Sequence, residues 1–169
     1  MVKRHRDFES LTDGVRLAEC AVRSPERLRQ EAGQWRDAFL RRLEREFLPP
    51  LDRRDLSALA ERIATVCLCL ADAVELQPGV HPLPSAIAAC TDALRAVTEA
   101  LPSYRQPERF SPPVTALRRC ASEAYRTFGR AAANAADLRS LVTQLTWQRC
   151  AAAFRSAAEA AVCAAINGV

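Results

Sequence analysis

The chain has 169 residues, a net charge of +4 and 49% hydrophobic residues, which excludes a disordered chain and suffices for one domain with a sizeable core. Five glycines and 6% aromatic residues stand beside abundant alanine, leucine and arginine, and this composition favours helices over strands. Arginines alternate with carboxylates, as in "RRLERE" at 41–46, so we expect solvated helix faces rather than a nucleic-acid surface.

The first residues, "MVKRHRDFES", are basic, but no apolar segment of a secretory signal follows them. No apolar run reaches the roughly 18 residues that a transmembrane helix needs. We therefore expect a cytoplasmic protein without direct membrane insertion. Its seven cysteines are odd in number and widely spread, which predicts free thiols that mostly fill the core.

Three helices are predicted in the first half of the chain. Apolar residues recur at helical spacing over 6–22 and over 25–47. Ser24 is a suitable N-cap for the second of these helices, because a proline follows at the first helical position. After the two prolines that end this helix, Asp52 is predicted to cap a third, and Asp55 to complete the cap from its first turn.

The second half is predicted to hold three more helices, at about 85–101, at about 112–132, and from Asn134 or Asp137 toward Gly168. The prolines of 102–113 indicate a break, and Ser111-Pro112 indicates the start of the fifth helix. The end of the last helix, "AAAFRSAAEAAVCAAI", is rich in small residues. Such a surface is expected to pack closely, either in the core or against a second subunit.

The six predicted helix starts form two sets of three, offset by about 80–87 residues. This spacing predicts an internal duplication, with repeat one at about 1–77 and repeat two at about 84–169. The predicted fold is therefore one all-α domain, a six-helix bundle built from two three-helix repeats with up-down, spectrin-like packing.

Catalytic apparatus is sparse in the sequence. His5 lies near the terminus, His81 lies in a proline-flanked loop, and neither has a partner at helical spacing. The glycines are isolated and form no phosphate-binding loop. We therefore expect no enzyme activity, no catalytic residue and no cofactor. Carboxylates on the helices are the residual metal-ligand candidates, although each reads more simply as a surface charge: Glu31, Glu61, Asp72 and Glu159.

One segment resembles a known family. "FLPPLDRRDLSALA", at 47–60, resembles the segment F-x-T-P-F-D-R-E-D-I-x-x-L-A of the PhoU-like family, in the branch of bacterial and archaeal proteins associated with Pit-type phosphate transporters. The matching residues are Phe47, Pro50, Asp52, Arg53, Asp55, Leu59 and Ala60. Pro49, Leu51 and Arg54 depart from the pattern. The family's duplicated three-helix organisation agrees with the repeats predicted above.

The resemblance also implies acidic metal-binding motifs on the inner helix faces. At those positions this chain carries mostly residues without a carboxylate: Gly33, Ala64, Thr65, Leu68 and Ser122. Only Glu159 keeps an acid near the final motif. Because such metal sites depend on hard oxygen ligands, the resemblance implies a divergent member that kept the bundle and lost the metal sites.

The function implied by the resemblance is that of an accessory or regulatory protein of inorganic phosphate transport. It would act by protein contact with a transporter or sensor, and it would lie at the inner membrane only through that partner. One alternative is a generic helical scaffold that forms a homodimer, which the alanine-rich last helix favours. A second alternative is a metal-binding PhoU-like protein that uses the residual carboxylates.

Overall fold

The computed structural model describes residues 5–19, 24–45, 51–77 and 83–168. These residues form six α-helices, one short 3-10 helix and no strand. The helices are α1 (His5–Glu19), α2 (Pro25–Arg45), α3 (Arg53–Leu76), α4 (Ser85–Ala100), the 3-10 helix η2 (Leu101–Ser103), α5 (Pro107–Ala133) and α6 (Leu138–Asn167). The all-α class and the six-helix count are thus confirmed for the described residues.

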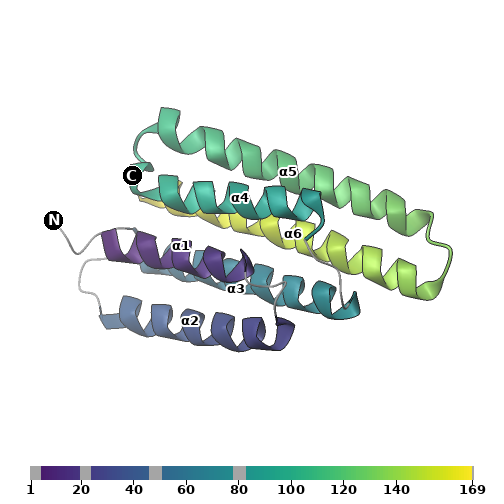
Figure 1. Cartoon of the computed structure of the whole chain (residues 1–169). Coiled ribbons are helices and arrows are strands. Elements are labelled where there is room, and N and C mark those ends of the chain that lie inside the picture. Colours follow the sequence, from purple (N-terminus) through teal and green to yellow (C-terminus); the bar gives the residue numbers. More distant parts are fainter. Residues whose placement is uncertain (1–4, 20–23, 46–50, 78–82, 169) are drawn as a thin grey trace.

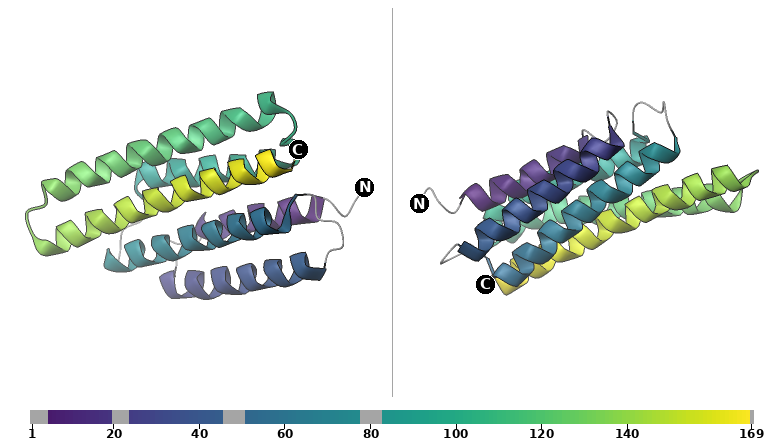
Figure 2. Two further views of the ribbon diagram at one scale, coloured as in Figure 1. Left: turned by 180° about the vertical axis from the view of Figure 1, so that it is seen from behind. Right: turned by 90° about the horizontal axis from the view of Figure 1, so that it is seen from below.

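The helices pack in two layers (Figure 1 and Figure 2). In one layer α2, α3, α6 and α5 lie side by side in that order. The second layer consists of α1 and α4, which contact each other and cover one side of the first. The two inner helices, α3 and α6, pack along much of their length, so the first three helices share one core with the last three.

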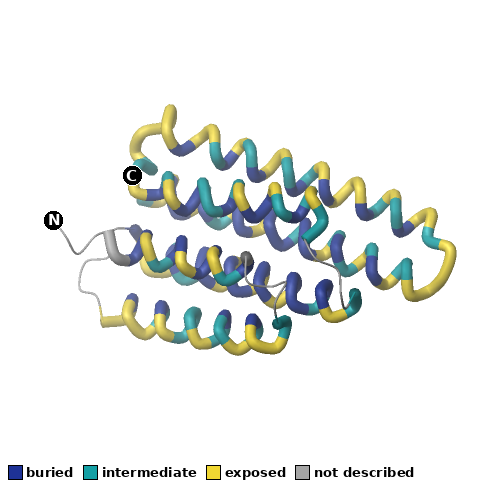
Figure 3. The backbone as a smooth tube through the Cα atoms, in the orientation of Figure 1, coloured by how far each residue is buried: buried dark blue, intermediate teal, exposed yellow. Residues whose placement is uncertain are grey.

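The predicted apolar stripes form this core. In α1 the apolar residues at helical spacing, Phe8, Leu11, Val15 and Ala18, are buried. The outward faces of the helices remain exposed (Figure 3). Periodicity therefore identified the buried face of α1, whereas the inner helices α3 and α6 bury residues on several sides.

Two predicted helix starts of the first half are confirmed. The backbone N–H of Arg27 donates to Ser24 Oγ at 3.3 Å, where Pro25 begins α2. The carboxylate of Asp52 accepts from the backbone N–H of Arg54 at 2.7 Å and caps α3. Both caps satisfy an N–H group that has no partner inside its helix.

The predicted break over 102–113 is confirmed in its first half, since α4 ends at Ala100, but it is shorter than predicted. The chain turns in η2, and α5 already begins at Pro107, so Pro112 and Pro113 lie inside the helix. Their missing N–H groups would have bonded to the carbonyls four residues earlier, at 108 and 109, and both of those residues are exposed to solvent. Two prolines are therefore tolerated in the second turn, and Ser111 is not a cap.

The last helix begins at the second of its two predicted caps. Asp137 accepts from the backbone N–H of Ser140 at 2.7 Å, whereas Asn134 caps the end of α5. The alanine-rich second half of α6 is buried within the chain's own fold, at Ala151, Ala153, Ala157, Ala158, Ala161, Ala164 and Ala165. These small residues were expected to pack either in the core or against a second subunit, and the structure shows them in the core.

None of the described helices is long and apolar enough to cross a membrane. The division into two repeats of three helices stays a prediction, since the all-helical architecture does not by itself demonstrate a duplication.

Candidate functional site

The four residual metal-ligand candidates each form an ion pair with arginine. Glu31 pairs with Arg27 within α2 at 2.6 Å, and Glu61 lies 3.9 Å from Arg36 of that helix. Glu159 accepts two hydrogen bonds from Arg118 of α5, at 3.0 and 2.7 Å. These carboxylates therefore neutralise arginines at separate places on the surface.

Asp72 is the most heavily engaged of the four. Arg29 of α2 donates to one of its oxygens at 2.9 Å, and Arg149 of α6 donates to the other. Arg29 also pairs with Glu75. This network of Arg29, Asp72, Glu75 and Arg149 joins three neighbouring helices of the four-helix layer. Within residues 5–19, 24–45, 51–77 and 83–168, no three His, Cys, Asp or Glu side chains gather as a metal-ligand group.

The family-like segment lies at the start of α3. Phe47 and Pro50 are outside the described residues, as is His81. Leu59 is fully buried, Arg53 is exposed, and Asp52 caps the helix. The carboxylate of Asp55 accepts from the Asn167 side chain at 3.0 Å and so ties the start of α3 to the end of α6. The described part of this segment thus has a structural role.

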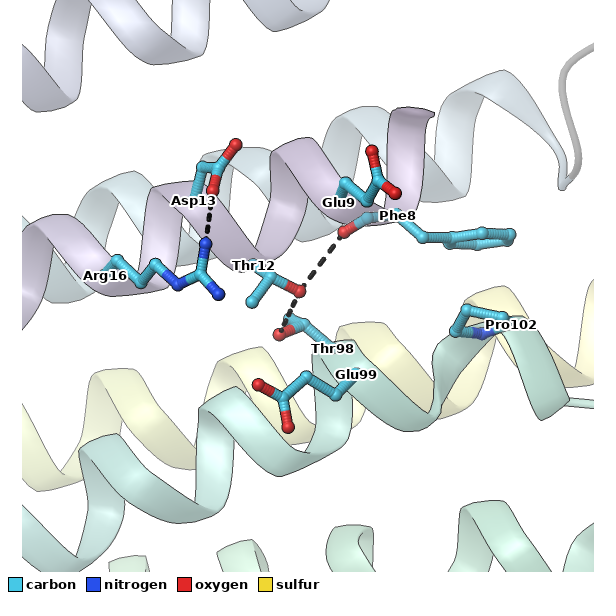
Figure 4. Close-up of a pocket in the computed structure, with 8 residues that line it drawn as sticks. All are labelled: Phe8, Glu9, Thr12, Asp13, Arg16, Thr98, Glu99 and Pro102. Carbon is cyan, nitrogen blue, oxygen red and sulfur yellow. Dashed lines mark hydrogen bonds and ion pairs between the residues drawn. The ribbon is translucent and has the colours of Figure 1, made fainter. Parts of the chain in front are cut away.

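A cavity of about 450 Å³ lies between α1 and α4 (Figure 4). The hydroxyl groups of Thr12 and Thr98 form a hydrogen bond of 3.1 Å at its wall, and both residues are buried. Glu9 and Glu99 line it as well, and Asp13 there is paired with Arg16 at 2.9 Å.

The lining groups of this cavity are mainly acceptors, which suit a small hydrogen-bond donor. The eight lining residues include no histidine or cysteine and so supply no conventional nucleophile–base pair.

The tip of the α5–α6 hairpin is the most distinctive surface. We call residues 124–147 the α5–α6 arm; it extends past the ends of α3 and α4 (Figure 1). At the base of the arm, Trp147 stacks on Phe128 with ring centroids 6.1 Å apart, and its indole N–H donates to Gln77 just after α3. Among the helices of the described residues, only α5 runs beside α6 beyond this point, so the arm is a pair of helices.

The arm exposes apolar side chains. Leu138 is 74% exposed, and Val142 and Leu145 are 40% and 47% exposed. Their spacing of four and three residues places them on one face of α6, opposite the buried Thr143 and Trp147. On α5, Tyr125 is 42% exposed, so four of the six large hydrophobics found exposed in the described part of the chain belong to the arm.

The arm is also basic. It carries Arg126, Arg130 and Arg139, against the single carboxylate of Asp137. That carboxylate caps α6, and the hydrogen bond from the Ser140 backbone lowers its pKa. The arm thus combines exposed apolar side chains with an excess of arginine, a composition that fits an acidic, amphipathic partner.

Comparisons with known proteins leave the chain without an assigned family. No protein-family model, no curated protein and no solved structure matches it. The resemblance to the PhoU-like family therefore rests on the sequence pattern alone.

Sequence reasoning missed both the cavity and the arm. The cavity depends on which faces of α1 and α4 meet, and no local pattern encodes that contact. The intervals of four and three residues between Leu138, Val142 and Leu145 do indicate an apolar face on one helix. The same spacing is equally typical of a buried stripe. The lengths of α3 and α4 relative to α5 and α6 reveal that no described helix covers this face.

Proposed function

We propose that the protein is a non-catalytic accessory of inorganic phosphate transport that acts by contact with another protein. The contact is supported by the α5–α6 arm, which combines exposed apolar side chains with arginines. The link to phosphate transport is supported by the resemblance around Asp52, Arg53 and Asp55.

The partner surface is an acidic, amphipathic helix on the cytoplasmic side of a phosphate transporter or its sensor. Leu138, Val142 and Leu145 form a row at the spacing by which two helices pack side by side. Carboxylates on the partner helix would pair with Arg126, Arg130 and Arg139, and this pairing speeds association and sets orientation. Because exposed charge pairs are screened by ions, the interaction weakens as the salt concentration rises.

The test compares two α6 variants in the host cell. The arm variant carries Leu138→Asn, Val142→Thr and Leu145→Asn, all at exposed positions. The control carries Ile166→Asn, which changes an apolar side chain of α6 that is 66% exposed but lies at the opposite end of the helix. Phosphate uptake is measured in rich and poor supply, beside a strain without the protein.

We expect the arm variant to behave like the strain without the protein and the control to behave like the wild type. Unchanged uptake in the strain without the protein would refute the phosphate role. A deletion phenotype that the arm variant does not reproduce would refute the arm as the contact surface. Arm-dependent binding to vesicles of anionic lipid, without any protein partner, would refute the assignment of a protein partner.

The two alternative functions predict other measurements. A homodimeric scaffold predicts a dimer by sedimentation, but the alanine-rich surface that suggested it is used inside the chain's own core. A metal-binding protein predicts stoichiometric metal in purified material. Its candidate ligands Glu31, Glu61, Asp72 and Glu159 would each have to leave an arginine partner.

A further inference from the structure

Two cysteines from the two halves of the chain meet in the interface between α3 and α6. Cys69 of α3 and Cys150 of α6 adjoin each other beside the ion pair between Asp72 and Arg149, and both are free thiols. Cys150 is fully buried, whereas Cys69 is 7% exposed and so lies nearer the edge of the interface. A reagent from solvent would therefore reach Cys69 first.

An arginine lies near the more accessible thiol. The guanidinium of Arg149 binds Asp72, about one helical turn after Cys69, so its positive charge acts on the Cys69 thiol. Asp72 is held in turn by Arg29 at 2.9 Å. Since 58% of the Arg149 side chain is exposed, the guanidinium is placed by Asp72 yet remains in contact with solvent.

These neighbours give the two thiols different acidities. The interaction with Cys150, followed by the positive charge of Arg149, lowers the pKa of Cys69, although burial and Asp72 oppose the shift. The same interaction and burial raise the pKa of Cys150. Cys69 is thus the more acidic thiol of the pair and the one that more readily forms the nucleophilic thiolate.

The pair differs from the other buried cysteines that the structure describes. Burial raises the pKa of Cys67 and of Cys90 to about 12. Cys67 also contacts the carbonyl oxygen of Gly14, with 3.7 Å between sulfur and oxygen. Such thiols are unreactive core residues, as the sequence predicted for the cysteines in general. Cys69 departs from that prediction because a cation and a second thiol adjoin it.

We propose that Cys69 and Cys150 form a dithiol site that reacts with low-molecular-weight disulfides by thiol–disulfide exchange. The Cys69 thiolate attacks one sulfur of the disulfide RSSR, forming a mixed disulfide and releasing RS⁻. Cys150 then loses its proton and attacks the Cys69 sulfur, which forms the Cys69–Cys150 disulfide and releases the second RS⁻. The two protein sulfurs lose two electrons and RSSR gains them: one RS⁻ takes the Cys150 proton, and the other takes from solvent the proton that Cys69 released when it ionised.

The product bond would join α3 covalently to α6. These helices belong to the first three and the last three of the fold, so the bond would lock the central interface of the bundle. This inference is independent of the proposed function, because it concerns a thiol pair away from the α5–α6 arm.

The test exposes the folded full-length chain to oxidised glutathione, alkylates the remaining thiols and maps the cysteines by peptide mass spectrometry. We expect a disulfide between Cys69 and Cys150 in the wild type. In Cys150→Ala the second step is blocked, so a glutathione adduct accumulates on Cys69. Cys163→Ala, which removes an exposed thiol of α6, is the matched control and should behave like the wild type.

Two results would overturn the proposal. One is a wild-type protein in which Cys69 and Cys150 are both still free thiols after the exposure and are therefore both alkylated. This result requires no variant, so it does not depend on whether Cys150→Ala folds. The other is a Cys150→Ala protein with native helical circular dichroism in which Cys69 carries no adduct even at about pH 9, where an ordinary thiol is largely ionised.

The role of Arg149 has its own readout. The rate of Cys69 modification should rise with pH around a midpoint below the ordinary thiol pKa in the wild type. The midpoint should move upward in Arg149→Gln, which removes the cation, and stay close to the wild-type value in Arg149→Lys. A midpoint that is the same in all three proteins would overturn the assignment of Arg149 as the positioning residue.

Discussion

The indole of Trp35 fills the contact between α1 and α2, and its N–H donates to the Ser10 carbonyl at 2.8 Å. This contact is possible because residue 14 of α1 is a glycine. A Cβ atom at Gly14 would lie 2.2 Å from the Trp35 ring. Gly33, in the middle of α2, has open space around it instead, with nothing within 4 Å of a built Cβ. The close contact with Trp35 thus requires a glycine at position 14, whereas no neighbouring atom requires one at position 33.

Alanine at these two positions should change stability in opposite directions. Gly14→Ala forces the indole or the helix to move, which costs about 2 kcal/mol. Gly33→Ala meets no neighbour and gains about 0.5–1 kcal/mol from helix propensity and lower backbone entropy in the unfolded chain. Urea unfolding followed by circular dichroism measures both. A Gly14→Ala protein as stable as the wild type would show that α1 and α2 are not in this close contact.

A buried carboxylate lies at the other end of α1. Asp7 is 2% exposed, and one of its oxygens accepts from Arg42 of α2 at 3.0 Å. Its second oxygen, Oδ2, is buried and has no hydrogen-bond partner among the described residues. The Arg42 side chain is 43% exposed and also lies over the Phe39 ring, 5.4 Å from its centroid. The two partners are therefore unequal, since only the carboxylate depends on the pair for its solvation.

Arg42→Met should accordingly cost about 3 kcal/mol, because it leaves the buried charge of Asp7 uncompensated while keeping an apolar stem near Phe39. Asp7→Asn should cost less, because water can solvate the released guanidinium. The double variant should be more stable than Arg42→Met alone. Denaturant unfolding of the three proteins gives the comparison, and a double variant less stable than Arg42→Met would contradict this account of Asp7.

At the scale of the helix, local chemistry predicted most of the elements. Ser24 and Asp52 were recognisable as caps because they precede a proline or a charged first turn, and the stripe of α1 indicated its buried face. The start of α5 was not predictable in this way. Whether a proline breaks a helix depends on whether solvent can satisfy the carbonyl that it leaves free. That depends on tertiary exposure, which the sequence pattern does not contain.

The prolines of α5 should therefore differ in their effect on stability. Pro112 is exposed in the second turn and deprives the carbonyl at 108 of its helical donor. Pro112→Ala restores that donor and should stabilise the protein by about 1 kcal/mol, since the loss of rigidity in the unfolded chain offsets part of the gain.

Pro107→Ala is the control. Pro107 occupies the first helical position, where the N–H has no intrahelical partner, so its replacement should be nearly neutral. Thermal unfolding by circular dichroism compares the two. Equal effects of the two substitutions would show that residues 107–111 do not belong to a continuous α5.

At the scale of the molecule, the interface between α3 and α6 links the first three helices to the last three. Asp55 and Asn167 lie near one end of it, Cys69 and Cys150 lie toward the other, and the alanines of α6 line the stretch between them. Small residues let α3 and α6 approach closely, so a larger side chain at this interface would displace both helices. The chain should therefore unfold as one cooperative unit rather than as two separate three-helix bodies.

The two tryptophans make this prediction measurable. Trp35 lies in α2 and Trp147 in α6, so single-tryptophan variants, Trp147→Phe and Trp35→Phe, report on the first and last three helices separately. In both backgrounds the fluorescence midpoint in urea should coincide with the circular dichroism midpoint. Ala157→Leu, at a fully buried residue seven positions after Cys150 and thus on the same side of α6, should lower both midpoints equally, by a cost of about 2 kcal/mol.

The control for Ala157→Leu is Ser156→Leu, which adds a similar side chain at the neighbouring exposed position of α6. It should leave both midpoints close to the wild-type value, because its new methyl groups project into solvent. If Ala157→Leu shifts the Trp147 transition and leaves the Trp35 transition in place, the first three helices are stable by themselves. The α3–α6 interface would then join two independent bundles, and a disulfide across it would tether them without stabilising either.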